Sequence, residues 1–153
     1  MNPPKIVSGG QTGADRNALD WALKRGIPCG GWCPRGRRAE DGPISHQYPL
    51  TETPSPDYAQ RTEWNVRDSS GTVVFSIGSK LAGGSQKTVE FARKQNKPLV
   101  HLQRGSGDAV KTLRRFVADH DIGILNIAGP RESEEPEVGE FVKSVLTEAF
   151  PPG

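Results

Sequence analysis

The sequence has 153 residues, of which 33% are hydrophobic and 18 are glycine, an ordinary composition for one globular domain. Its 20 Lys and Arg residues nearly balance 18 Asp and Glu residues, and a net charge of +2 favours neither a nucleic acid nor a membrane as partner. No apolar run has the length of a membrane span, and the N-terminus lacks a signal peptide. We therefore expect one cytoplasmic domain over residues 1–153, with Cys29 and Cys33 as reduced thiols.

A glycine loop near the N-terminus is the first candidate ligand site. Residues 5–8 are predicted to form a short strand, and Ser8-Gly9-Gly10-Gln11-Thr12-Gly13 leads from it into a helix. The apolar positions of that helix, at 14, 18, 19, 22 and 23, lie on one face. Because the loop precedes a helix N-terminus, with its free N–H groups and positive dipole end, it is suited to an anion.

The loop departs from the dinucleotide-binding fingerprint. Ser8 replaces the first glycine, and the region about 20 residues later, Cys33 to Arg38, is basic where an NAD site has an acidic residue. An NAD site is therefore disfavoured, and NADP has little support. A phosphate or oxyanion cradle and a simple tight turn both remain open, and Gln11 and Thr12 favour the cradle because they add hydrogen-bonding side chains.

After the first helix, residues 27–33 are predicted to form a second strand, and the regular pattern then stops. Residues 34–57 contain five prolines and show no periodicity, yet they also carry aromatic, basic and acidic side chains. Loops of this length in compact domains are commonly functional or disordered, and this composition is unlike a linker. We expect an ordered lid over the first glycine loop, in which Arg37 and Arg38 supply charge to the ligand pocket or to a subunit contact that borders it.

Residues 58–68 are predicted to form a helix that is unusually polar. Arg61 and Asn65 are four residues apart and share a face, as do Trp64 and Asp68. A guanidinium and an amide on one face suit a planar polar ligand that bears an oxyanion. The same charges could equally form a surface ion-pair network.

The clearest strand is 72–77, and a second glycine loop over residues 78–85 follows it before a helix predicted at 86–95. This loop resembles a P-loop, but Gly84 stands where the phosphate-binding lysine belongs. Lys80 and Lys87 could supply charge, at positions unsuited to triphosphate hydrolysis. No Asp on a later strand is placed to hold Mg²⁺, so a nucleoside triphosphatase is disfavoured.

The rest of the chain predicts a strand at 98–102, a helix at 108–119, a strand at 122–127 and a helix at 136–149. Five strands that alternate with helices predict an α/β fold with a Rossmann-like, mostly parallel open sheet and helices on both faces. Ligands of such sheets bind beyond the carboxyl ends of the strands. Both glycine loops and the segment 126–133 leave strands at that edge, so we expect them to line one pocket.

Other chemistry has little support in the sequence. Ser8, Ser76 and Ser85 lack the Gly-x-Ser-x-Gly pattern of a nucleophile elbow. His46, His101 and His120 have no metal-ligand spacing, and His101 is expected to be a hydrogen-bonded structural residue within its strand. We assign no catalytic residue and no metal ligand.

Four separated motifs together resemble the molybdenum cofactor carrier family, over nearly the whole chain. They are residues 8–16 (SGGQTGADR), residues 31–42 (GWCPRGRRAEDG), residues 61–68 (RTEWNVRD) and residues 128–133 (AGPRES). The resemblance implies a Rossmann-like fold related to lysine-decarboxylase-like proteins and a homo-oligomer, expected to be a tetramer. It also implies that the protein binds, stores or hands on the molybdenum cofactor, a pterin with a phosphate and a molybdenum oxo group, with molybdoenzymes as possible recipients.

Two other functions stay open. Related phosphoribohydrolases cleave nucleoside monophosphates with a glutamate in the second glycine loop; here Glu90 stands at a different spacing, and Glu40 and Asp41 are further candidates. A nucleotide-sensing module is the third possibility. The candidate residues for binding the molybdenum cofactor, or molybdate, are Gly9, Gly10, Gln11, Thr12, Gly13, Arg16, Arg35, Arg37, Arg38, Arg61, Asn65, Gly83, Gly84, Ser85, Lys87 and Thr88.

Overall fold

The structure of the protein is a computed structural model that describes residues 2–81 and 83–153. Its centre is a five-stranded sheet in the order β2-β1-β7-β5-β6, in which every pairing is parallel. The strands are β1 (Lys5–Val7), β2 (Cys29–Gly30), β5 (Gly71–Ser76), β6 (Leu99–Gln103) and β7 (Ile124–Ala128). The predicted Rossmann-like α/β fold is confirmed.

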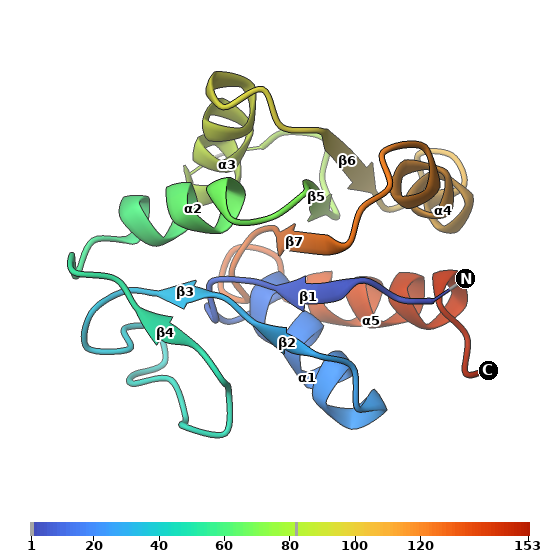
Figure 1. The fold of residues 1–153 in the computed structure, drawn as a ribbon. Helices are drawn as coiled ribbons and strands as arrows, with labels where there is room; N and C mark the ends of the chain where they lie inside the picture. Colours follow the sequence, from blue (N-terminus) through green and yellow to red (C-terminus); the bar gives the residue numbers. More distant parts are fainter. Residues whose placement is uncertain (1, 82) are drawn as a thin grey trace.

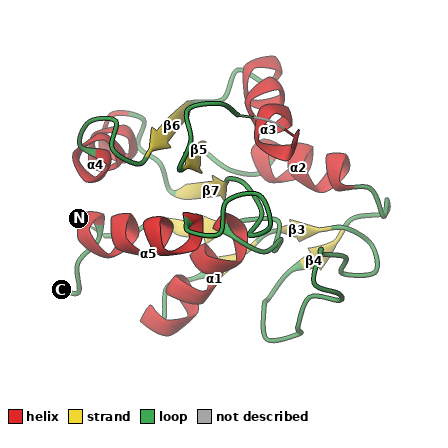
Figure 2. Cartoon of the chain, turned by 180° about the vertical axis from the view of Figure 1, so that it is seen from behind, coloured by secondary structure: helices red, strands yellow, loops and turns green. Residues whose placement is uncertain are grey.

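Five helices cover the sheet. They are α1 (Ala14–Arg25), α2 (Tyr58–Arg67), α3 (Gly83–Lys94), α4 (Ala109–Asp119) and α5 (Val138–Ala149). Helices α2 and α3 pack together on one side, whereas α5 packs against both α1 and α4 on the other (Figures 1 and 2). The third helix begins at Gly83, three residues before the prediction, because glycines that favour loops in isolation form its first turn here.

Strand β5 is the centre of the core, and all six of its residues are buried. Its apolar run explains this position, since a parallel strand covered on both faces needs hydrophobic side chains throughout. Val73 and Phe75 lie in one apolar cluster with Leu125 and Ile127 of β7 and with residues of α1, α4 and α5. This rigid centre holds the carboxyl ends of β1, β5 and β7 at one edge.

The single strand predicted over residues 27–33 is wrong, because Gly31 divides it. Gly31 has a φ of +126°, and a side chain there would meet the Ser8 carbonyl oxygen at 2.4 Å. Beyond the break the Trp32 amide donates to Asn65 Oδ1 at 2.8 Å, and Asn65 Nδ2 donates to the Trp32 carbonyl at 2.9 Å. The chain therefore leaves the main sheet and forms β3 (Trp32–Cys33), which pairs in parallel with β4 (Thr51–Glu52).

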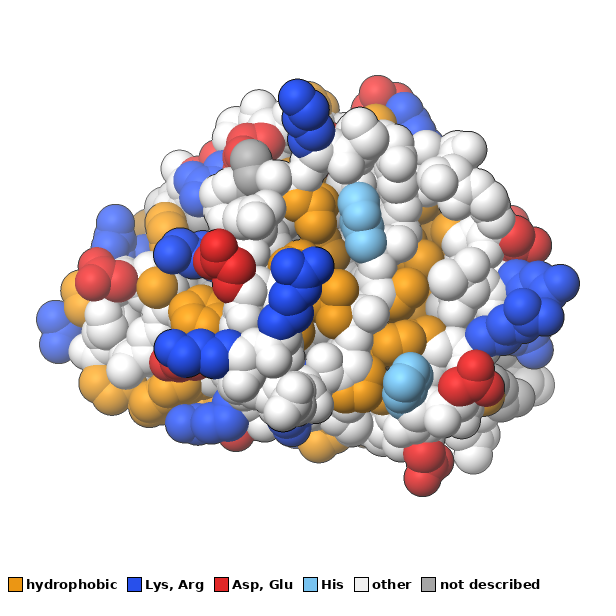
Figure 3. All heavy atoms as spheres, turned by 90° about the horizontal axis from the view of Figure 1, so that it is seen from above, with side chains coloured by type: hydrophobic (Ala, Val, Ile, Leu, Met, Phe, Trp, Pro, Cys, Tyr) orange, Lys and Arg blue, Asp and Glu red, His pale blue; other side chains and the backbone are white. Residues whose placement is uncertain are grey.

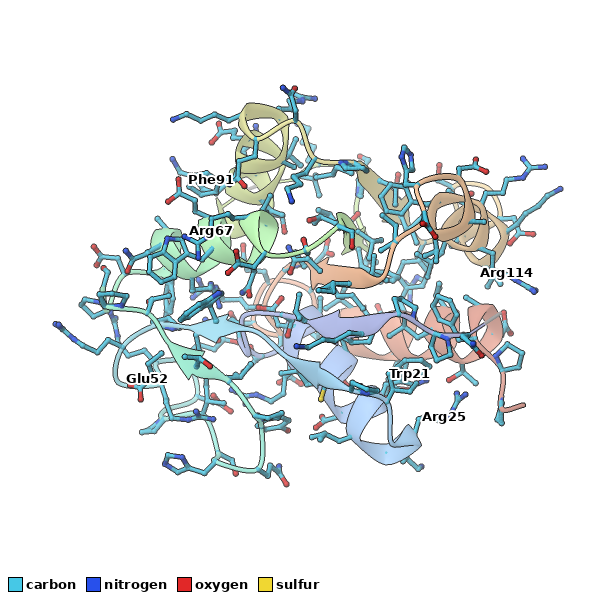
Figure 4. All side chains as sticks on the ribbon, viewed as in Figure 1. Trp21, Arg25, Glu52, Arg67, Phe91 and Arg114 are labelled. Atoms are coloured by element: carbon cyan, nitrogen blue, oxygen red, sulfur yellow. The ribbon has the colours of Figure 1, made fainter. Side chains whose placement is uncertain are left out.

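The segment 34–57, predicted to lack regular structure, contains β4 and is organised around Arg37. The Arg37 guanidinium donates to four backbone carbonyls of the segment, at 2.8 to 3.3 Å, namely those of Ile44, Ser45, Tyr48 and Leu50. Ile44 and Tyr48 form a small apolar cluster with Leu19 and Cys33. Glu52, labelled in Figure 4, accepts from the Gly36 amide at 2.6 Å. The segment is thus held by its own hydrogen bonds and by packing against Leu19 of α1.

The two ends of the sheet differ in chemistry. Both termini lie at the amino edge, where Arg25 stacks over Trp21 with its guanidinium carbon 5.1 Å from the ring centre (Figures 1 and 4). At the carboxyl edge the chain instead forms polar loops. Within the described residues no helix is long and apolar enough to cross a membrane.

Candidate functional site

The three loops predicted to converge do line one pocket, at the carboxyl edge of the sheet. The first loop and α1 contribute Gly9, Gln11 and Asp15; α2 contributes Arg61, Thr62 and Asn65; α3 contributes Gly84, Ser85 and Thr88; β7 and its following loop contribute residues 126–131 and Glu134. The cavity volume is about 40 Å³. That is room for a few water-sized groups, which suits an oxyanion and not a whole nucleotide or pterin.

Arg61 is the buried cation of this pocket. Its side chain is 9% exposed, and it reaches from α2 across the sheet edge to the Gly9 carbonyl, to which Nη1 donates at 3.0 Å. Nε donates to the Thr62 hydroxyl at 3.1 Å. A guanidinium has five N–H donors. With two of them engaged by described residues, Arg61 retains donors for a ligand.

Asp15 is the counter-charge of Arg61, and sequence reasoning missed it. Its carboxylate is 3.6 Å from Arg61 Nη1 and accepts from the Gln11 amide at 3.4 Å. Burial raises the pKa of Asp15 to about 6, and the nearby positive charge of Arg61 opposes part of that shift. The ion pair therefore titrates near physiological pH, and protonation of Asp15 leaves the pocket with the uncompensated charge of Arg61.

Two buried donors facing the pocket have no partner among the described residues. They are Gln11 Nε2 and Ser85 Oγ, on side chains that are 5% and 4% exposed. The orientation of the Gln11 amide is fixed because its Oε1 accepts from the amides of Thr12 and Glu40 at 3.0 and 2.9 Å. Its Nε2 must then be the free end. An unsatisfied buried donor is costly, so a ligand that accepts from both would stabilise the site.

The N-terminus of α3 adds backbone donors to the same pocket. Gly84 and Ser85 are in the first turn of this 12-residue helix, where the N–H groups have no partner within the helix. The helix dipole favours negative charge at this end. Together with Arg61, Gln11 and Ser85 these groups form a set of donors that converges on one small cavity.

The β7–α5 connection supplies a second pair of charged residues to the wall. Arg131 and Glu134 both line the pocket and pair with each other at 3.4 Å. The Arg131 guanidinium also lies 5.5 Å from the centre of the Tyr58 ring. Neither was predicted as a site residue. Arg131 belongs to the segment 126–133, which was predicted to reach this edge, and Glu134 is the residue directly after that segment.

Several predicted first-loop residues lie behind the pocket. Gly10 faces Leu50 and Ile44, and a Cβ there would be 2.5 Å from Leu50 Cδ1. Gly13 passes beneath the Pro130 carbonyl oxygen, which a Cβ would meet at 2.4 Å. These glycines allow the loop to pack closely and do not line the cavity.

Thr12, predicted as an oxyanion donor, is engaged elsewhere. Its hydroxyl donates to the Glu40 carboxylate and accepts from the Glu132 amide at 3.1 Å. Glu40 also accepts from the Ser133 hydroxyl at 2.6 Å. These hydrogen bonds lower the pKa of Glu40, with the Ser133 hydroxyl as the largest cause. The four residues form a clasp that ties the segment 34–57 to two pocket loops from outside the pocket.

The four predicted ligand-binding arginines Arg16, Arg35, Arg37 and Arg38 do not line the pocket. Arg16 donates to the Gly10 carbonyl and pairs with Asp41, whose pKa it lowers. Arg37 is bound to the carbonyls described above, and Arg38 donates to the Pro56 carbonyl at 2.7 Å. Arg35 is exposed. The segment 34–57 therefore covers the outer side of the first loop and contributes no charge to the cavity wall.

Of the predicted residues on α2 and α3, some line the pocket and others lie outside it. Thr88 and Asn65 line the pocket, although the Asn65 amide is already bound to the backbone of Trp32. Gly83 is exposed and outside the wall, and Lys87 is exposed and pairs with Glu90 at 3.8 Å. Residue 82 of the second glycine loop lies outside the described residues.

The residues that line the pocket include no cysteine and no histidine. Among the described residues no cluster of His, Cys, Asp and Glu is arranged to hold a metal ion. Cys29 and Cys33 are free thiols whose pKa values are raised by burial. His101 contacts Ser76 Oγ through Nε2 at 2.6 Å, which confirms its predicted hydrogen bond, and burial lowers its pKa.

An open parallel sheet with a polar pocket beyond its carboxyl edge places the chain in the Rossmann-like class of α/β proteins. Residues 6–150 match the sequence model of the circularly permutated YpsA SLOG family. The chain belongs to that family.

One solved structure is closely similar to this chain. It is the crystal structure of a protein from Syntrophus aciditrophicus named a putative molybdenum carrier protein, which is 48% identical, with 97% of this chain and 94% of that chain covered at a TM-score of 0.90. The structure of (E)-4-hydroxy-3-methyl-but-2-enyl diphosphate reductase is 11% identical, covers 95% of this chain and 59% of that one, and has a TM-score of 0.43, too low to carry an argument. No protein with a curated description matches the sequence.

Proposed function

We propose that this protein binds the oxyanion part of a small ligand in the pocket beside Arg61 and stores or transfers that ligand without chemical turnover. The molybdenum cofactor, or molybdate, is the ligand that we favour. The observation that carries the proposal is the pair of buried, unpartnered donors Gln11 Nε2 and Ser85 Oγ next to the Arg61 guanidinium. A tetrahedral oxyanion can accept from all three at once.

Two further observations support this ligand. The 48% identical protein from Syntrophus aciditrophicus is named a putative molybdenum carrier protein. The cavity volume of about 40 Å³ is also matched to an oxyanion, so a larger cofactor would place only its anionic group inside and leave its planar ring at the mouth. Arg61 and Arg131, which both line the pocket, also lie over the Tyr58 ring, 5.2 and 5.5 Å from its centre.

We also propose that the protein works as a homo-oligomer, with a tetramer expected, and that molybdoenzymes receive its ligand. Strand β6 supports a contact between copies, because it is the last strand of the sheet and one of its edges has no partner strand among the described residues. Figure 3 shows hydrophobic side chains gathered between the ends of α3 and α4, where this edge lies. Light scattering on the purified protein measures the assembly.

Hydrolysis of nucleoside monophosphates is the competing function, and Asp15 is the observation that favours it. A carboxyl group with a pKa of about 6 in a pocket has the properties of a general acid or base. The sequence candidates for that role lie elsewhere, since Glu40 is bound in the clasp, Asp41 pairs with Arg16, and Glu90 pairs with Lys87.

Binding and turnover experiments separate the two functions. Molybdate, sulfate and phosphate titrations should give saturable binding that Arg61→Met reduces and Arg67→Met leaves unchanged. Arg67 is the matched control because it is on the same helix, exposed, and paired with Asp68. Mass spectrometry of the protein purified without denaturation should identify the ligand. Base release from any nucleoside monophosphate that Asp15→Asn abolishes would instead establish the hydrolase.

A further inference from the structure

A second cavity adjoins the pocket on the side of the second glycine loop. Its volume is about 170 Å³, and it is lined by Ser76, Lys80, Leu81, Ser85, Pro130, Glu134 and Glu135. Ser85, Pro130 and Glu134 line both cavities, so the two spaces are neighbours across a common wall. The function proposed above uses the smaller pocket and gives this larger cavity no role.

Glu135, one of the residues that line this cavity, has its carboxylate bound to two neighbouring backbone amides. The amides of Ile77 and Gly78, directly after β5, donate to the two carboxylate oxygens of Glu135 at 2.7 and 2.9 Å. The Ser76 hydroxyl fixes this turn, because it lies 2.7 Å from the Gly78 carbonyl oxygen. Two adjacent N–H groups directed at one carboxylate form a concave site that suits phosphate or sulfate oxygens equally well.

The surroundings favour an anion with more charge than a carboxylate. Lys80, an exposed basic residue, lines this cavity, and so does Ser85 in the first turn of α3, where the helix dipole favours negative charge. The Ser85 hydroxyl, 4% exposed and without a partner among the described residues, lines this cavity as well as the first pocket. Of the two acidic residues in the wall, Glu134 is paired with Arg131, and Glu135 is the group seated on the amides.

We propose that the second cavity is a second oxyanion subsite of the same ligand site, which the Glu135 carboxylate fills in this structure and a ligand displaces. The ligand class is therefore one with two oxyanion groups, such as a diphosphate or a phosphate ester that also bears a metal-oxo group. This inference rests on the proposed function of the first pocket. Glu135 acts as an internal competitor: it keeps the Ile77 and Gly78 amides satisfied and leaves when the second anionic group arrives.

Phosphate and pyrophosphate test the proposal, because one has a single oxyanion group and the other has two. In calorimetric titrations at pH 7.5, Glu135→Ala should bind pyrophosphate about tenfold more tightly than the wild type, and phosphate within about twofold of it. Glu137→Ala is the matched control: it removes the same charge two residues away, from an exposed pair with Arg104, and should change neither affinity. Lys80→Ala should weaken pyrophosphate alone.

The backbone amides give a readout that a structural role of Glu135 would not produce. In the wild type, the amide resonances of Ile77 and Gly78 should shift with pyrophosphate and stay in place with phosphate. Glu135→Gln keeps the side-chain size and one accepting oxygen, so it should show an intermediate gain in pyrophosphate affinity. It replaces Glu135→Ala in the test if the alanine variant is unstable.

The outcomes separate this inference from the proposed function. Equal gains for phosphate and pyrophosphate in Glu135→Ala, or no gain for pyrophosphate, would overturn the second subsite while the first pocket stands. A wild type that binds neither anion would overturn both.

Discussion

Two arginines of this protein are almost equally buried and have opposite roles. Arg37 is 8% exposed and Arg61 is 7% exposed. Arg37 donates to four carbonyls of the segment that it organises, whereas Arg61 donates to one carbonyl and one hydroxyl and faces a cavity. Burial and charge are the same in both. The difference is the number of N–H donors that the protein itself uses.

The comparison shows how a binding arginine differs from a structural one. A buried guanidinium whose donors are satisfied stabilises the backbone around it and offers nothing to a ligand. A buried guanidinium with free donors, beside other unpartnered donors such as Gln11 Nε2, lowers the stability of the unliganded protein and favours an anion. Substitutions at the two positions should therefore affect different measurements.

Arg37→Met should cause the largest change, a loss of about 4 kcal/mol in unfolding free energy, because four carbonyls lose charge-assisted hydrogen bonds and water replaces them only in part. Urea unfolding measures this. Arg37→Lys should recover little, since an ammonium cannot reach four carbonyls in this arrangement. Arg38→Met, which removes one bond to Pro56 from an exposed neighbour, should change stability by less than about 0.5 kcal/mol. Equal losses for the two substitutions would contradict the structural role of Arg37.

Arg61→Met should leave the fold intact and reduce sulfate affinity about 100-fold, the loss of one charge-assisted contact in a buried site. The cost to stability should be small, because Asp15 can take up a proton when its counter-charge is removed. Calorimetric titration measures the affinity, and thermal unfolding checks the fold. If the Arg61→Met protein binds sulfate as tightly as the wild type, Arg61 does not bind the anion.

Asp15 makes the pocket sensitive to pH. Its folded pKa of about 6 is above the value of about 3.9 in an unfolded chain. The folded protein thus holds this proton more tightly, so stability falls as pH rises from about 4 to about 6 and stays lower above that range. Asp15→Asn should raise the unfolding free energy at pH 7.5 by about 2 kcal/mol, with no gain at pH 4.

The same titration should appear in ligand binding. Sulfate does not titrate in this range, so its affinity in the wild type should rise about tenfold from pH 7.5 to pH 5, as protonation of Asp15 leaves Arg61 unpaired. In Asp15→Asn the affinity should be high and independent of pH. A pH-independent wild type would show that the Asp15 carboxylate does not oppose the anion.

Thr12→Val should give the smallest change, a loss of about 1 kcal/mol in stability through the clasp with Glu40 and Ser133. Sulfate affinity should stay within about twofold of the wild type, because the Thr12 hydroxyl does not face the pocket. Ser133→Ala is the companion variant, since it acts on the same carboxylate from the other side. A 100-fold loss of affinity in Thr12→Val would show that the oxyanion binds beside Thr12 and the clasp, and not in the pocket beside Arg61.

Much of the fold could be predicted because its signals are local. The apolar run of β5 and the apolar faces of α1 and α5 can be identified without tertiary information, and the alternation of strands and helices then predicts a parallel sheet. The division of the chain at Gly31 could not be predicted, because it depends on the Ser8 backbone and the Asn65 amide, which are far away in the sequence.

The location of the pocket could be predicted better than the residues that line it. Three loops leave the carboxyl edge of a parallel sheet, and their convergence follows from topology alone. Gln11 and Ser85 were identified on this basis, whereas Arg61 was identified from the helix face that it shares with Asn65. Asp15 and Glu135 were missed because acidic residues contradict a simple anion site, and their roles depend on partners in α2 and in the turn after β5.

The amino-acid sequence by itself determined the α/β class, the edge of the sheet where a ligand could bind and the polar loops that meet there, because periodicity and glycine placement act over a few neighbouring residues. Only the tertiary structure decided which donors are free. Arg37 and Arg61 are the same residue type, and nothing near either in sequence shows that one is surrounded by carbonyls and the other by a cavity. A donor is free only when none of its neighbours in space accepts from it, and those neighbours come from every part of the chain.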